Sequence, residues 1–143
     1  MNEIATSGGA PSFNLDDYAT DAQKELQGVW RNIGKDKNGK TREVKLARES
    51  NENYMSALRV LQRKNQALLE MNDDEAFSLA EEIARECYSK HILKGLRVDG
   101  VEMSKTPDEY REMLKNKDFF AKIRTLAGQM DSYKIEDEQS VKS

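Results

Sequence analysis

Residues 28–47 read GVWRNIGKDKNGKTREVKLA, and this stretch sets where the ordered part of the chain begins. Apolar and polar side chains alternate over residues 29–33 and again over residues 42–47, which is the pattern of half-buried strands. Asn38-Gly39 lies between them, and its readily adopted positive φ angles suit a tight hairpin turn. Because an isolated hairpin is only marginally stable, we expect its apolar side to pack against the helices that follow.

The first predicted strand leaves open which of its two sides is buried. Trp30 and Asn32 share one side, whereas Val29, Arg31 and Ile33 share the other. Tryptophan is more often a core anchor than a binding residue, yet alternation by itself does not choose between the two sides.

Four stretches after the hairpin carry apolar side chains at spacings of three and four residues, which predicts amphipathic helices beginning near residues 51, 73, 106 and 116. The third has the sharpest start, because the sequence Thr-Pro-Asp-Glu at residues 106–109 combines a capping box with proline at the first helical position. Residues 96–104 are expected to form a short connection. We therefore predict a mainly α fold, in which an N-terminal β-hairpin is followed by about four packed helices.

Length and composition predict one domain with flexible ends. The chain has 143 residues, of which 37% are apolar and 34% charged, so part of its length is not expected to belong to a core. Residues 1–27 are predicted to form a flexible acidic tail with linker composition. Residues 28–133 are predicted to form the hairpin-plus-helices domain, and residues 134–143 a flexible polar tail.

The formal net charge of −3 is unevenly distributed along the chain. Residues 1–27 carry five acids against one base, whereas residues 31–48 carry seven bases against two acids. The basic hairpin is interpreted either as a surface for an acidic partner or as a solubilising edge, because exposed lysines discourage edge-to-edge strand pairing. The candidate partner-binding residues are Trp30, Arg31, Lys35, Lys40, Arg42, Lys45 and Arg48.

No catalytic, cofactor-binding or metal site is expected from the sequence. Cys87 and His91 lie four residues apart on one predicted helix, but a structural zinc site needs four such ligands and the chain has one cysteine and one histidine. Cys87 lies on the apolar stripe, which favours a small core residue over a nucleophile. The turn around residues 36–39 lacks the spacing of a calcium-binding loop, and no phosphate-binding glycine motif occurs. We therefore expect a protein that is not an enzyme.

Nothing in the sequence predicts a membrane protein or a secreted one. Its apolar runs are far shorter than the roughly eighteen residues that a bilayer-spanning helix needs. Residues 1–4 lack the pattern of a signal peptide, and one cysteine cannot form an internal disulfide. We expect a cytoplasmic location.

Two groups of segments, taken in order, resemble a known family. The first group is residues 28–30, the lysine-rich turn and residues 45–51; the second is residues 90–96, the Asp99-Gly100 turn, residues 106–110 and the closing helix. In this order they are similar to the tail assembly chaperone-like proteins of long-tailed bacteriophages. The resemblance covers about residues 27–133 and leaves both ends of the chain outside it.

The resemblance implies a non-enzymatic assembly factor in the cytoplasm of the infected host cell. Such proteins coat the long helical tape measure protein and help tail tube subunits polymerise around it, and they are usually absent from the finished particle. In this family a translational frameshift sometimes produces a second, C-terminally extended product. Members often carry Gly-Trp where this chain has Gly95-Leu96, so packing at that corner is expected to differ.

Methionine-bearing helix faces suit a reversible contact with such a client, although core filling is the commoner role of methionine. The candidates are Met55, Met71, Met103, Met113 and Met130. A structural component of the virion, such as a head–tail connector or tail-tip subunit, is the second hypothesis. A small nucleic-acid-binding regulator is the third, disfavoured because the rest of the chain is acidic. Assembly into a homo-oligomer is compatible with these hypotheses.

Overall fold

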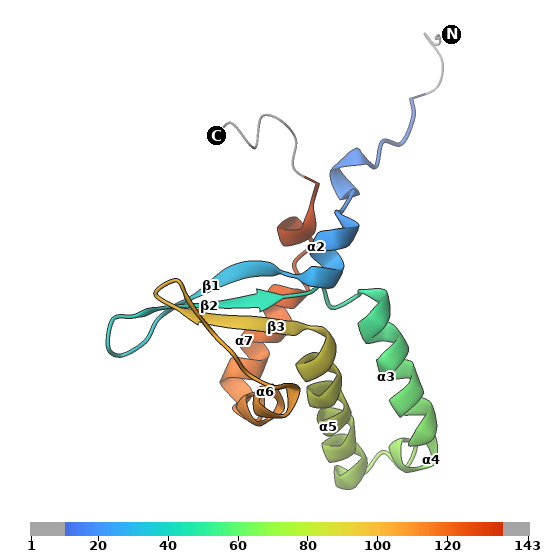
Figure 1. Ribbon diagram of the computed structural model, residues 1–143. Coiled ribbons are helices and arrows are strands. Elements are labelled where there is room, and N and C mark those ends of the chain that lie inside the picture. Colours follow the sequence, from blue (N-terminus) through green and yellow to red (C-terminus); the bar gives the residue numbers. More distant parts are fainter. Residues whose placement is uncertain (1–10, 136–143) are drawn as a thin grey trace.

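Four antiparallel strands form one sheet, and the main helices pack against a single face of it (Figure 1). The structure is a computed structural model that describes residues 11–135. The strands lie side by side in chain order: β1 (Val29–Lys35), β2 (Thr41–Leu46), β3 (Leu93–Val98) and β4 (Val101–Met103).

The helices fall before, between and after the two strand pairs. They are η1 (Asp16–Tyr18), α2 (Ala22–Gln27), α3 (Glu52–Lys64), α4 (Gln66–Leu69), α5 (Asp74–His91), α6 (Pro107–Met113), α7 (Lys117–Ala127) and η2 (Met130–Tyr133). The four longest helices begin where a side-chain oxygen accepts a backbone N–H, at Asn51, Asp73, Thr106 and Asn116. The predicted capping box between Thr106 and Glu109 is confirmed.

The predicted mainly α fold, a hairpin followed by four helices, is wrong, because the described chain is α+β with a four-stranded sheet. The predicted connection over residues 96–104 instead contributes most of a second hairpin, β3–β4, which pairs with β2. The local pattern of β3 is weak, since alternation is short and Gly95 interrupts it. β2 pairs with β1 along one edge and with β3 along the other. The hydrogen bonds to β2, which is distant in the sequence, therefore stabilise β3 as a strand.

The strand register places the apolar positions on the helix-covered face of the sheet. Val44 of β2 pairs with Arg31 of β1 and Leu96 of β3, and Val44 and Leu96 are buried. The inner side of β1 is therefore the side that carries Arg31 and Ile33. Trp30 lies on the opposite, open face of the sheet.

Tyr88 of α5 lies fully buried at the centre of the core. Its ring meets the ring of Tyr54 in α3 edge to face at a centroid distance of 5.3 Å, and that of Phe120 in α7 at 5.1 Å. The Tyr88 hydroxyl donates a hydrogen bond to the carboxylate of Glu49, which lies between β2 and α3. One side chain thus joins three helices to the connection that leaves the sheet.

The helix α2 falls within residues 1–27, for which the sequence predicts a flexible tail. Backbone hydrogen bonds fix this helix to the domain: Asp21 N donates to Tyr133 O at 2.7 Å, and Arg48 N donates to Glu25 O at 2.8 Å. The ordered domain therefore includes α2, and the prediction of a flexible tail is wrong for this helix.

The beginning and the end of the domain lie together. Thr20 and Lys134 form an isolated antiparallel bridge, and Tyr133 is buried with its hydroxyl donating to Leu46 O at 3.1 Å. The parts of the predicted tails at residues 1–10 and 136–143 lie outside the described residues.

Replacing Tyr88 by Phe tests its hydroxyl separately from its ring. The variant keeps both ring contacts but leaves the part-buried Glu49 carboxylate without this donor, so the free energy of unfolding should fall by about 1–3 kcal/mol. Tyr88→Ala also removes the ring and should cost about 3–5 kcal/mol. Urea denaturation followed by circular dichroism measures both values.

The control Tyr18→Phe, at a tyrosine that is 61% exposed, should change the free energy of unfolding by less than about 0.5 kcal/mol. A Tyr88→Phe variant as stable as the unmodified chain would contradict this account.

Candidate functional site

The three arginines of the predicted partner-binding site form hydrogen bonds or ion pairs within the chain. Arg31 donates to Gln129 Oε1 at 2.9 Å and to the Ser132 hydroxyl. Arg42 donates to the backbone carbonyls of Gly34 and Lys35, at 3.3 and 3.2 Å, and so braces the β1–β2 hairpin. Arg48 pairs with Glu25 at 3.5 Å beside α2. Each of these three guanidinium groups therefore has a structural role.

The lysines of the predicted site divide between two places. Lys35 and Lys40 are exposed at the β1–β2 turn, whereas Lys45 lies half-buried on the open face of the sheet. Asp36 fixes the turn, because its carboxylate accepts hydrogen bonds from the backbone N–H of Asn38 at 2.8 Å and of Lys40 at 3.0 Å. The hydrogen bond from Lys40 is the largest cause that lowers the pKa of this carboxyl group. The turn is consequently a well-ordered, positively charged corner.

Trp30 lies on the open face of the sheet under the guanidinium group of Arg97. The Arg97 Cζ atom is 4.1 Å from the centroid of the Trp30 ring, which is a cation–π contact. Glu43 on β2 orients that guanidinium group through two hydrogen bonds, of 2.7 and 3.0 Å. Gly95 provides the space for the indole, since a Cβ atom there would lie 3.0 Å from Trp30 Cη2. Trp30 is thus a half-buried, covered residue and not a free aromatic side chain.

An apolar groove lies on the opposite face, between the sheet and the helices α6 and α7. Its volume is about 510 Å³. Its apolar lining comes from all four strands and both helices: Ile33, Val44, Leu96, Val98, Met103, Met113 and Phe119. The charged residues at the same groove are two arginines and two glutamates: Arg42, Arg97, Glu43 and Glu112. Sequence reasoning singled out Met103 and Met113 but missed the remaining apolar residues, because the groove requires the β3–β4 hairpin that was not predicted.

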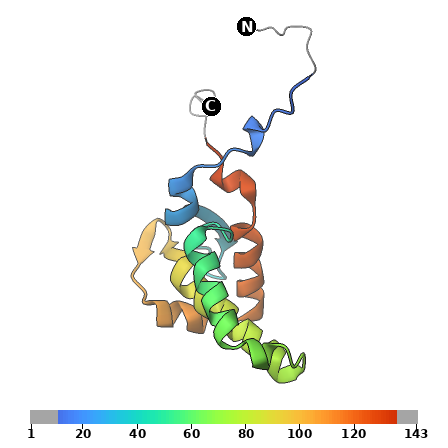
Figure 2. The same cartoon turned by 90° about the vertical axis from the view of Figure 1, so that its right-hand side faces the viewer.

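The helices α3 and α4 and the start of α5 form a projection from the domain (Figures 1 and 2). Three large apolar side chains at its end, on α4, the following turn and the start of α5, are each more than half exposed: Leu68, Met71 and Phe77. We call these three residues the apolar tip.

The apolar spacing that predicted the helices beginning near residues 51 and 73 includes Leu68, Met71 and Phe77, and so assigns the apolar tip to buried stripes. α3 instead ends at Lys64, and the side-chain amide of the capping residue Asn65 donates to Leu61 O at 2.8 Å. This break takes Leu68 and Met71 off the α3 stripe. Phe77 lies at the start of α5, before that helix reaches the core.

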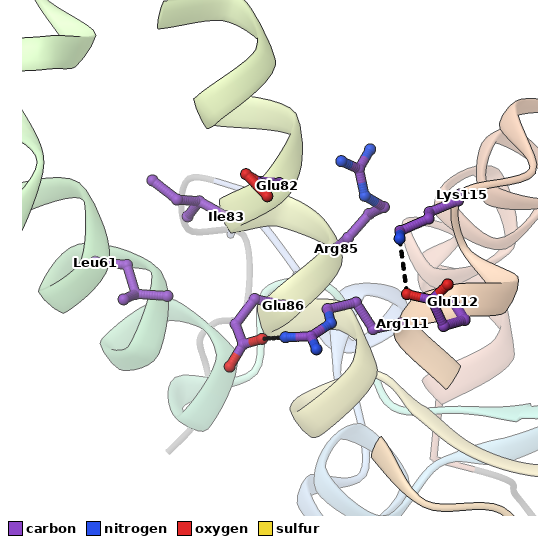
Figure 3. Close-up of a pocket in the computed structure, with 8 residues that line it drawn as sticks. All are labelled: Leu61, Glu82, Ile83, Arg85, Glu86, Arg111, Glu112 and Lys115. Atoms are coloured by element: carbon purple, nitrogen blue, oxygen red, sulfur yellow. Dashed lines mark hydrogen bonds and ion pairs between the residues drawn. The ribbon is translucent and has the colours of Figure 1, made fainter. Parts of the chain in front are cut away.

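A polar cleft between α3, α5 and α6 contains a cluster of ion pairs (Figure 3). Glu86 pairs with Lys90 at 2.5 Å and with Arg111 at 2.7 Å, and Glu112 pairs with Lys115 at 2.7 Å. The hydrogen bond from Lys90, and then that from Arg111, lower the pKa of the Glu86 carboxyl group. Because cations already neutralise both of these carboxylates, we interpret the cluster as a structural contact that fixes α6 to α5.

Cys87 and His91 do not form a reactive pair. Cys87 is buried in the core, and burial is the main cause that raises the pKa of its thiol. Burial, followed by Lys94 and Lys90, lowers the pKa of His91. Within residues 11–135, no group of three or more side chains of the metal-ligating types is gathered at one place.

Comparison with protein-family models, curated proteins and solved structures finds no match for this chain. The helices between residues 11 and 135 include none with the length and apolar character that crossing a bilayer requires. A functional interpretation therefore depends on the sequence resemblance and on the geometry of the surfaces described above.

Removing the Arg97 side chain should uncover Trp30. In Arg97→Ala the indole loses its cation–π cover, so we expect its fluorescence emission to shift to longer wavelength and its quenching by acrylamide to increase about twofold or more. Trp30 is the sole tryptophan, so the signal reports this position alone. Arg59→Ala, at an exposed arginine of α3, is the control and should leave both readings unchanged. Unaltered quenching in Arg97→Ala would exclude the proposed cover.

The cover over Trp30 should also depend on pH through Glu43. The hydrogen bond from Arg97 lowers the pKa of this carboxyl group below its ordinary value of 4.5, so the pair persists at pH 4.5. It is lost as the pH falls through the lowered pKa, because protonation neutralises Glu43 and releases Arg97. We expect acrylamide quenching to rise in that acidic range, in samples whose far-ultraviolet circular dichroism remains native. Glu43→Gln should remove this pH-dependent step, and a step that persists in that variant would assign it to another group.

Proposed function

We propose that this protein is a tail assembly chaperone of a long-tailed bacteriophage, which binds the tape measure protein and promotes assembly of the tail tube around it. One observation carries the proposal beyond the sequence resemblance. The apolar tip exposes three large apolar side chains within ten residues, where α4 leads into α5 at the end of a helical projection. Exposed apolar clusters of this kind are typical of surfaces that bind other proteins.

The chemistry of the apolar tip suits a long amphipathic helical client. An amphipathic helix binds through apolar side chains at spacings of three and four residues, and its partner must offer an apolar surface of complementary shape. Met71, which is 67% exposed, adds a flexible side chain that can adapt to differing stretches of such a client. Residues 59–64 carry three bases and residues 70–75 carry four acids, so charges of both signs surround the tip. This mixture favours a client whose polar face also carries both signs.

The position of the apolar tip allows client binding without disturbing the core. α3 packs against the core through Tyr54, Leu58 and Leu61, whereas Leu68, Met71 and Phe77 do not belong to the core or to the side chains packed against it. A client can therefore cover the exposed side chains while the internal contacts stay intact. Such reversible covering is what a chaperone that leaves before the particle is complete requires.

The two other hypotheses have less support. A nucleic-acid-binding role would rely on the basic hairpin, but Arg31, Arg42 and Arg48 are already engaged within the chain. The remaining basic residues lie on one short turn, which offers few contacts to a phosphate backbone. A structural virion component remains the alternative, and it predicts a fixed copy number in purified particles where a chaperone predicts absence.

The proposal is tested by co-expressing the tagged chain with the tape measure protein of the same genome. We expect the tape measure protein to become soluble and to be captured in stoichiometric amounts. The double variant Leu68→Ser/Phe77→Ser should lose about nine-tenths of this capture, because each buried apolar side chain at a contact contributes roughly 1.5–3 kcal/mol. Quantitative mass spectrometry of the captured material measures the loss.

The matched control is Val101→Ser, which replaces a comparably exposed apolar residue, 68% exposed, on β4. This variant should capture as much tape measure protein as the unmodified chain. A tape measure protein that is equally soluble without the chain would reject the proposed function. Equal loss of capture in both variants would reject the apolar tip as the binding surface.

A further inference from the structure

The segment before α2 is an exposed arm with an acidic and apolar character. Phe13, Leu15 and Tyr18 are 87%, 57% and 61% exposed, and none of them belongs to the core. Asp16 and Asp17 lie between them, so residues 13–18 carry two negative charges and no positive one. We call residues 13–18 the acidic arm. It presents three large apolar side chains within six residues, which is the composition of a docking segment.

The turn that adjoins the groove between the sheet and α6–α7 has the opposite charge. Residues 35–42, which form the adjoining turn, carry Lys35, Lys37, Lys40 and Arg42 against a single acid. That acid, Asp36, is committed to the turn through its hydrogen bonds to backbone N–H groups. The charged residues that line the groove balance, Arg42 and Arg97 against Glu43 and Glu112, so its excess of positive charge lies at the adjoining turn. The acidic arm, in contrast, is apolar and negative.

The acidic arm and the groove lie at different ends of the same molecule (Figure 1). The arm leaves the domain beside α2 and runs away from the sheet, whereas the β1–β2 turn lies at the far end of the strands. α2 itself is fixed by its hydrogen bonds to Tyr133 and Arg48, so the arm starts from a defined point. This geometry holds the arm away from the groove of its own chain.

The apolar tip is a poorer occupant for the groove than the acidic arm. It carries bases from α3 together with acids from the α4–α5 turn, so its charges do not complement a basic rim. The acidic arm combines large apolar side chains with negative charge alone. β4 does the same with Val101, Met103 and Glu102, but Met103 itself lines the groove. Charge complementarity therefore selects the arm.

We propose that the acidic arm of one copy of this chain docks in the groove of a second copy. Phe13 and Leu15 fill the apolar lining, and Asp16 and Asp17 face the lysines of the β1–β2 turn. The contact joins two different surfaces, so each docked copy still offers a free arm or a free groove. Such a head-to-tail contact builds rings if it closes and open chains if it does not. The inference goes beyond the client-binding role and does not depend on it.

The test measures self-association of the purified full-length chain by sedimentation velocity over a concentration series. The unmodified chain should form species larger than a monomer, and added salt should weaken them because the contact includes exposed charges. An arm variant, Phe13→Ser/Leu15→Ser, and a groove variant, Met103→Glu, should each remain monomeric. Lys35→Glu/Lys40→Glu, in which both changed side chains are exposed, should weaken association about tenfold or more.

The decisive sample is a mixture of the arm variant and the groove variant. The groove variant retains an intact arm and the arm variant retains an intact groove, so the mixture should form a dimer and nothing larger. Leu68→Ser/Phe77→Ser, which changes the apolar tip, is the control and should associate like the unmodified chain. A chain that stays monomeric at all concentrations, variants that still associate, or a mixture that stays monomeric would each overturn the proposal.

Discussion

The edge-to-face contacts of Tyr88 are the interaction on which the rest of the structure depends. Its ring lies against Tyr54 and Phe120, so α3, α5 and α7 share one point of contact. Next to it, Asn51 caps α3 by accepting from Tyr54 N, and its side-chain amide donates to Arg48 O and His91 O. The end of β2, the start of α3 and the end of α5 are thereby fixed together. The remaining surfaces of the molecule take their positions from this junction.

The elements that the sequence predicted well are those whose signals are local. The alternation around Asn38-Gly39 specified the β1–β2 hairpin, and the capping residues specified where the long helices begin. The β3–β4 hairpin was missed because its stability comes from β2, about fifty residues earlier in the chain. The same long-range pairing explains why the apolar groove was not predicted. The apolar groove requires residues from all four strands, so a fold without β3 and β4 could not contain it.

The predicted binding residues illustrate a related limit of sequence reasoning. A count of charges treats arginines and lysines as equivalent, yet Arg31 and Arg42 are fixed by carbonyl and side-chain acceptors, whereas Lys35 and Lys40 extend into solvent. Likewise, the periodicity of the first helix could not reveal that Asn65 ends it and leaves Leu68 exposed. Which charges and apolar residues remain free is a property of tertiary contacts, not of composition.

The bridge between Thr20 and Lys134 has a mechanical consequence. Together with the hydrogen bond from Asp21 N to Tyr133 O, it holds the first and last segments of the domain side by side. Tension applied to the two ends of the chain would load these few bonds one at a time, in an unzipping geometry. α2 and η2 would carry the load first, and the hydrogen bond from the Tyr133 hydroxyl to Leu46 O would pass part of it to β2. The domain therefore meets a pulling force with its outermost helices, ahead of the Tyr88 junction.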